Sequence, residues 1–179
     1  MGQPLAYLLT WTCRGTWLHG DPRGSIERLE KDGTRLLEPD PERLDLARTR
    51  SRTKPVALDQ ESRDAVARII DEHCRVRGWP LFAPSVLSNH AHVVVRVDGP
   101  PEPVMQQLKS WSTRILREHG HLGPVWTRHG STKYLWDQHS VNRAVLYVRE
   151  GQTGAFVIAR ENSKKKSRAC ARGLDQENP

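Results

Sequence analysis

The stretch Ser88-Asn89-His90-Ala91-His92-Val93-Val94-Val95-Arg96-Val97 is typical of a β-strand that is buried on one side. Side chains alternate across a strand, so residues two apart share a face. One face is entirely apolar and consists of Ala91, Val93, Val95 and Val97. The other face carries Ser88, His90, His92, Val94 and Arg96. Two imidazoles therefore project from the more polar face, as in a metal site, although such a pair can also lie on a merely solvated face.

Strands and helices are expected to alternate around this stretch. A helix is predicted over residues 59–77, between an N-cap at Asp59 and a stop at Gly78. A strand follows over 79–87, where Pro84 indicates an edge position or a bulge. The remaining expected elements are a strand over 5–13, a helix over 101–119, irregular structure over 121–136, and a helix from Asp137 or Ser140 to Gly151. This order predicts an α+β fold, ferredoxin-like, with helices packed on a mostly antiparallel sheet.

The length of 179 residues fits one domain, which we place over residues 1–158. Residues 14–55 are predicted to form a long polar insertion that is partly ordered. Residues 159–179 are expected to form a basic, disordered tail. The chain has 28 Lys and Arg residues against 21 Asp and Glu residues, a net charge of +7. This balance favours a polyanionic partner, of which nucleic acid is the commonest.

Three cysteines, Cys13, Cys74 and Cys170, lie far apart and form no disulfide framework or zinc motif. They are typical of a reducing compartment. The first residues do not resemble a signal peptide, and no apolar stretch approaches membrane-spanning length. We therefore expect a cytoplasmic protein with no membrane partner.

Basic residues gather in two segments that could contact nucleic acid. In the first, the candidates for phosphate contact are Arg14, Arg48, Arg50, Arg52 and Lys54, although a charged run is often only a solvated loop. In the second, basic and aromatic residues interleave in a pattern that suits stacking and phosphate contact with single strands. Its candidates are Arg128, His129, Lys133, Tyr134 and Trp136, with Trp126 nearby, and simple packing is the alternative. Three other tryptophans are assigned to the core: Trp11, Trp79 and Trp111.

The last predicted helix contains a candidate nucleophile in Tyr147-Val148-Arg149-Glu150-Gly151-Gln152. A tyrosine hydroxyl can form a covalent intermediate, and attack on a phosphodiester needs a cation to take up developing charge. Tyr147 lies at the border of the apolar stripe centred near Val141 and Val148, where a tyrosine can also serve only in packing. A hard divalent cation would need an oxygen ligand besides the two imidazoles.

Three segments together resemble the HUH endonucleases, and in particular their small single-tyrosine transposases. They are 86–95 with its His-hydrophobic-His motif, 125–136, and Tyr147 to Gln152. The opening residues 9–21 resemble the first strand and turn of such proteins. The resemblance covers most of residues 5–153 and again implies a ferredoxin-like fold.

The resemblance implies a transposase that cleaves and rejoins single-stranded DNA through a covalent 5′-phosphotyrosine intermediate with Mg²⁺ or Mn²⁺. By motif position, His90 and His92 are metal ligands and Tyr147 is the nucleophile. The partners would be single-stranded or hairpin DNA and a second copy in a homodimer. The sequence departs from the family in two places. The middle residue of the histidine motif is usually bulky but is Ala91 here, and no glutamine lies one helical turn after the tyrosine, where the family's third ligand is typical. Gln152 is preferred by resemblance, whereas an unbroken helix favours Glu150, three residues after the tyrosine.

Two other functions fit the same residues. One is a hairpin DNA-binding protein without catalysis, which would bind in a salt-dependent way and form no covalent adduct. The other is a metal-dependent phosphoesterase that uses an activated water instead of Tyr147.

Overall fold

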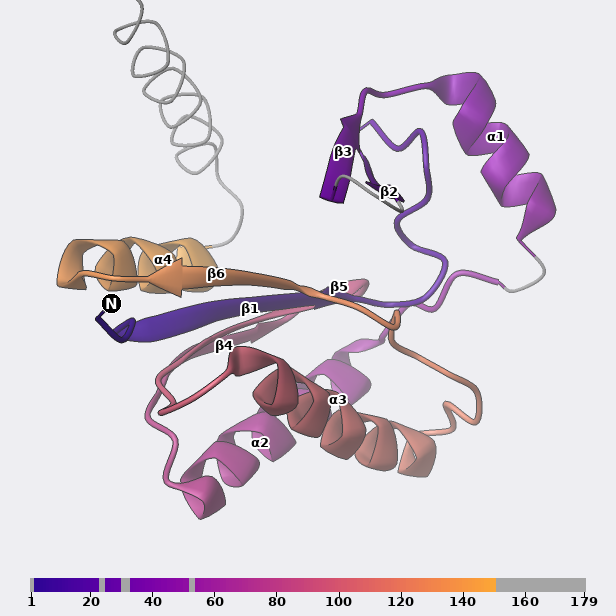
Figure 1. Ribbon diagram of the computed structural model, residues 1–179. Coiled ribbons are helices and arrows are strands. Elements are labelled where there is room, and N and C mark those ends of the chain that lie inside the picture. The colour runs from indigo at the N-terminus through magenta and orange to yellow at the C-terminus, as the bar shows by residue number, and fades with distance from the viewer. Residues whose placement is uncertain (1, 23–24, 30–32, 52–53, 151–179) are drawn as a thin grey trace, which may run out of the picture.

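The computed structural model describes residues 2–22, 25–29, 33–51 and 54–150, without the side chains of 25–29 and 33–36. Its centre is a four-stranded sheet in the order β4-β5-β1-β6, in which every neighbouring pair is antiparallel. Figure 1 shows α2 and α3 on one face of this sheet and α4 on the other. The strands are β1 (Ala6–Thr12), β4 (Leu81–Val86), β5 (His90–Val95) and β6 (Ser131–Leu135). The three helices are α2 (Gln60–Arg77), α3 (Pro101–Glu118) and α4 (Gln138–Glu150).

Two interleaved crossovers build the sheet. The chain runs from β1 through α2 to β4 and later from β5 through α3 to β6. Since β5 lies between β1 and β4, and β1 lies between β5 and β6, each crossover joins parallel strands across an antiparallel one. This arrangement is ferredoxin-like, and the predicted fold class is confirmed. Pro84 lies on β4, an edge strand, as expected, because the ring cannot donate a ladder hydrogen bond.

Each face of the sheet has its own apolar core. Beneath α2 and α3 the core includes the fully buried Leu9, Trp11 and Leu108, together with Ala91, Val93, Val95 and Val97. Beneath α4 the core includes Leu8, Val94, Val141, Ala144 and Val148. The alternation predicted for the histidine strand is therefore confirmed, since its apolar face packs on α2 and α3. His90 and His92 share the face of Val94, under α4.

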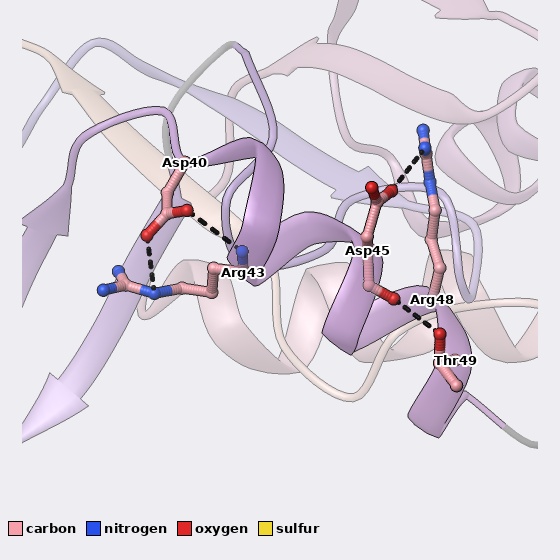
Figure 2. A network of polar contacts seen from close by, with 5 residues as sticks. All are labelled: Asp40, Arg43, Asp45, Arg48 and Thr49. Carbon is pink, nitrogen blue, oxygen red and sulfur yellow. Dashed lines mark hydrogen bonds and ion pairs between the residues drawn. The ribbon is translucent and has the colours of Figure 1, made fainter.

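The segment between β1 and α2 contains regular structure. A hairpin of β2 (Ser25–Leu29) and β3 (Gly33–Leu37) precedes α1 (Pro41–Arg50). Figure 2 shows how α1 is held by its own polar side chains: an Asp40 carboxylate oxygen accepts a hydrogen bond from the Arg43 backbone N–H at 3.0 Å, and Arg48 pairs with Asp45 at 3.3 Å. No residue of α1 is buried, so its charged side chains are exposed to solvent.

Two expectations were wrong. Residues 121–136 are not all irregular, because Ser131–Leu135 form the edge strand β6, in which only Leu135 is buried. Trp111 is not in the core: it is 38% exposed, with its ring between the His73 ring and the Arg114 guanidinium.

Cys13 and Cys74 are buried free thiols. Cys170, the predicted tail and Gln152 lie outside the described residues. In the part of the chain that the structure describes, no helix has the length and apolar character needed to cross a membrane.

Candidate active site

His90 and His92 lie at the start of β5, on the face that α4 covers. The strand β5 pairs with β1, so that His90 is opposite Thr12 and His92 is opposite Thr10. The two imidazole ring centroids are 4.7 Å apart, with the rings nearly perpendicular. His92 is 6% exposed, whereas His90 is half-buried at the end of the strand. The pair therefore lies where the apolar core under α4 meets the surface.

Each imidazole has a side-chain oxygen beside its Nδ1 atom. The Thr10 Oγ1 atom is 2.8 Å from His92 Nδ1, and the Asn89 Oδ1 atom is 2.6 Å from His90 Nδ1. The other nitrogen of His92, Nε2, is buried and has no hydrogen-bond partner among the described residues. An unpartnered buried polar atom costs about 1–3 kcal/mol, and a cation is one of the things that can satisfy it. His92 and His90 thus fit a divalent cation, which they would hold through nitrogen.

Burial, and then the nearby His90 charge, lower the pKa of His92 to about 4. Its imidazole is therefore neutral at physiological pH, which is the form that binds metals.

Tyr147 approaches the histidines from α4. The helix begins after Asp137, whose side chain accepts a hydrogen bond from the Ser140 N–H at 2.8 Å, as an N-cap does. Its buried stripe of Val141, Ala144 and Val148 packs on the sheet. Tyr147 precedes Val148 and is half-buried at the border of this stripe. Its ring centroid is 5.3 Å from that of His92, edge to face. The structure thus brings a phenol and two imidazoles together from two elements far apart in sequence.

Among the described residues, no acidic side chain joins the two histidines in a group that could hold a metal ion. Glu150 is the last residue of α4 and is exposed. Two residues beyond the buried Val148, it lies about 200° around the helix, on the side away from the sheet. Within the described ranges no group of three His, Cys, Asp or Glu residues is arranged to hold a metal ion. Gln152, the other candidate, lies outside the described residues.

Hydroxyl and amide side chains around the pair were not predicted as part of the site. Besides Thr10 and Asn89, Thr12 lies opposite His90, and its Oγ1 atom is 3.2 Å from the Thr127 Oγ1 atom. Thr10 and Thr12 are polar residues in an otherwise apolar strand, and this pattern could have identified both as candidate site residues. Their position beside the imidazoles follows only from the pairing of β1 with β5.

The candidate nucleic-acid residues of the 126–136 segment are divided between two places. Arg128 and His129 are exposed just after Thr127, whose N–H donates to the Thr12 carbonyl, so they lie near the histidine end of the sheet. Tyr134 and Trp136 lie toward the opposite end, since Leu135 pairs with Ala6. These two rings are 44% and 57% exposed and stack with centroids 5.9 Å apart.

Four other basic candidates are exposed on different elements. Lys133 is on β6, Arg14 follows β1, Arg50 ends α1, and Lys54 comes shortly before α2. Arg48 is exposed on α1 and paired with Asp45. Arg52 lies outside the described residues.

Trp126 is not available for stacking with bases, because it is buried in the core against Trp11 with ring centroids 6.1 Å apart. The loop that follows it is held by Lys109, whose ammonium donates to the carbonyls of Thr127 and Arg128 at 2.5 and 3.1 Å.

The fold thus gathers two imidazoles, a phenol and several hydroxyl groups at one end of one face of the sheet, near exposed basic residues. Comparison of the chain with protein-family models and with curated proteins finds no match.

Proposed function

We propose that this protein is a metal-dependent endonuclease and strand transferase of the HUH type, a transposase that acts on single-stranded DNA. Tyr147 would be the nucleophile, and His90 and His92 would hold Mg²⁺ or Mn²⁺ with Gln152 as the preferred third ligand. The observation that carries this proposal is the position of the Tyr147 ring 5.3 Å from that of His92, which in turn lies 4.7 Å from that of His90. A nucleophile and its metal ligands must lie this close for one phosphate to reach both.

The chemistry assigned to Tyr147 is an in-line displacement at phosphorus. Its hydroxyl loses a proton, the phenolic oxygen forms a bond to phosphorus, and the bond from phosphorus to the 3′ oxygen of the leaving strand breaks. That 3′ oxygen gains a proton and becomes a hydroxyl. A second 3′-hydroxyl then attacks the phosphotyrosine and releases Tyr147, so the strands are rejoined without ATP. When bound, the divalent cation would neutralise charge that develops on the phosphate oxygens.

The surface supports a single-stranded or hairpin DNA substrate. The chain carries a net charge of +7, and Arg128 and His129 are exposed near the histidine end of the sheet. Stacking of Tyr134 on Trp136 offers a flat aromatic surface to unpaired bases. A homodimer is the expected oligomeric state, which light scattering of the purified protein would test, and the cytoplasm is its expected location.

The proposed function is tested by trapping the covalent intermediate. Wild-type protein is incubated with a labelled pool of hairpin-forming single strands and Mg²⁺ or Mn²⁺, then denatured and separated by size. We expect a denaturation-resistant DNA adduct that Tyr147→Phe abolishes and that EDTA prevents. Tyr7→Phe is the matched control, because the Tyr7 ring lies in the core under α2 and α3 and its hydroxyl donates to the Gly99 carbonyl at 3.0 Å, so this variant should still give the adduct.

Three outcomes would contradict the proposal. An adduct of equal yield in Tyr147→Phe excludes this tyrosine as the nucleophile. Salt-dependent hairpin binding with no adduct points to a binding protein without catalysis. Cleavage of model phosphoesters that survives Tyr147→Phe points to attack by water.

A further inference from the structure

We infer that Thr10 and Asn89 are positioning residues, which hold His92 and His90 in the tautomer that turns both Nε2 lone pairs toward one cation. The inference rests on the proposed metal site and adds two residues that act through the imidazoles. They come from separate segments, Thr10 from β1 and Asn89 from the residue before β5. Both place a side-chain oxygen on the same ring atom, Nδ1, at 2.8 and 2.6 Å.

The tautomer of His90 follows from the chemistry of Asn89. The Oδ1 atom that faces His90 Nδ1 is an amide oxygen, which can only accept a hydrogen bond. Nδ1 must therefore carry the proton and donate it. In a neutral imidazole the lone pair is then on Nε2, the nitrogen farther from the backbone.

The tautomer of His92 follows from its surroundings. The Thr10 hydroxyl could donate or accept, so this contact alone allows either tautomer. His92 Nε2, however, is buried without a hydrogen-bond partner among the described residues. A proton on Nε2 would leave a buried donor unsatisfied, which is rarer in proteins than an unsatisfied acceptor. The favoured arrangement has Nδ1–H donating to Thr10 Oγ1 and the lone pair on Nε2.

In both histidines Nδ1 then donates to a side-chain oxygen, and the Nε2 lone pair is available to a cation. Metal-binding histidines usually donate their second ring N–H to an oxygen, which fixes the orientation of the ring and raises the basicity of the binding nitrogen. Thr10 is able to do this because the β1–β5 pairing puts it directly opposite His92. Asn89 is able to do this because it is adjacent to His90 in the chain. Removing either oxygen should leave the imidazole in place but free its tautomer and its rotation.

The test uses two pairs of variants, and in each pair one variant loses the side-chain oxygen and the other keeps it. Thr10→Val keeps the shape of the side chain and loses the oxygen, while Thr10→Ser keeps a hydroxyl. Asn89→Leu loses the acceptor, while Asn89→Asp keeps it. Ring tautomers are measured by long-range ¹⁵N–¹H NMR of the histidines in the metal-free protein, near pH 7.5, with thermal melting to show that each variant folds. Mn²⁺ affinity is measured separately by calorimetry.

We expect both wild-type rings to show the Nδ1–H pattern. Thr10→Val should alter the pattern of His92 alone, and Asn89→Leu that of His90 alone. Each loss should weaken Mn²⁺ binding by roughly 10–100-fold, the usual effect of removing such a partner, and Ser and Asp should restore binding. Wild-type rings in the Nε2–H form, or rings unchanged in Thr10→Val and Asn89→Leu, overturn the inference even if Mn²⁺ binds. The expected ring changes with no Mn²⁺ binding to wild type overturn the proposed metal site instead.

Discussion

Replacing His92 by leucine should remove a strong pH dependence from the stability of the metal-free protein. Burial and the neighbouring His90 charge hold the pKa of His92 at about 4 in the folded chain, against an ordinary value of 6.5. Between these two values the unfolded chain binds more protons than the folded one, so stability falls as the pH falls. Above about pH 7.5 the ring is neutral in both the folded and the unfolded chain, and about 2 kcal/mol of stability is lost between about pH 7.5 and pH 5.

The assay is urea denaturation of wild type and His92→Leu across this pH range, each protein treated with EDTA. Titrating groups that the two proteins share contribute equally and largely cancel in the difference between their free energies of unfolding. We expect that difference to move by about 2 kcal/mol in favour of the leucine variant as the pH falls to about 5. His129→Leu is the control for the exchange of a histidine for leucine, because His129 is exposed whereas His92 is buried. A constant difference between wild type and His92→Leu would refute the buried, neutral placement of the ring.

Three further substitutions test the fold and the surface. Leu108→Ala, at a fully buried position under the sheet, should lower the free energy of unfolding by about 2–5 kcal/mol in urea, and a loss far smaller would contradict its place in the core. Gly130→Ala should destabilise by about 1–3 kcal/mol in thermal melting, because the added methyl would lie 2.6 Å from the Thr10 carbonyl oxygen and would contact the Met105 sulfur. Trp136→Ala should weaken single-strand binding by about 1–3 kcal/mol in fluorescence anisotropy at fixed salt, whereas unchanged binding would remove this ring from the interface.

The elements that the sequence predicted well are those in which buried and exposed positions differ sharply. The helix α2 starts after Asp59 and ends at Gly78, which has a left-handed φ of 66°, as expected. The strand β6 was missed because an edge strand with a single buried residue has almost no apolar periodicity. Trp111 was misplaced for a related reason: helical spacing puts it near the buried stripe, but an aromatic ring at that border can fold outward onto His73 and Arg114.

The candidate site was predictable in part. Strand alternation alone puts His90 and His92 on one face, and the structure has them there. The approach of Tyr147 could not be derived, because periodicity places this residue on its helix but does not say which face of the sheet the helix covers. The contact of Thr10 with His92 was out of reach as well, since it requires the register between β1 and β5. The sequence left Trp126 open between base stacking and packing, because alternation of basic and aromatic residues carries no information on burial, and the structure buries it.

The central position of β1 has a consequence for how the chain is made. During synthesis β1 leaves the ribosome well before its two neighbours, because β4 and two helices separate it from β5 and a further helix precedes β6. Until they emerge, Leu9 and Trp11 have no sheet to be buried in, so the nascent chain exposes two large side chains that are fully buried in the folded protein. The four-stranded sheet can therefore be complete only after residue 135 has left the ribosome, and its long-range strand pairing is of the kind that folds slowly.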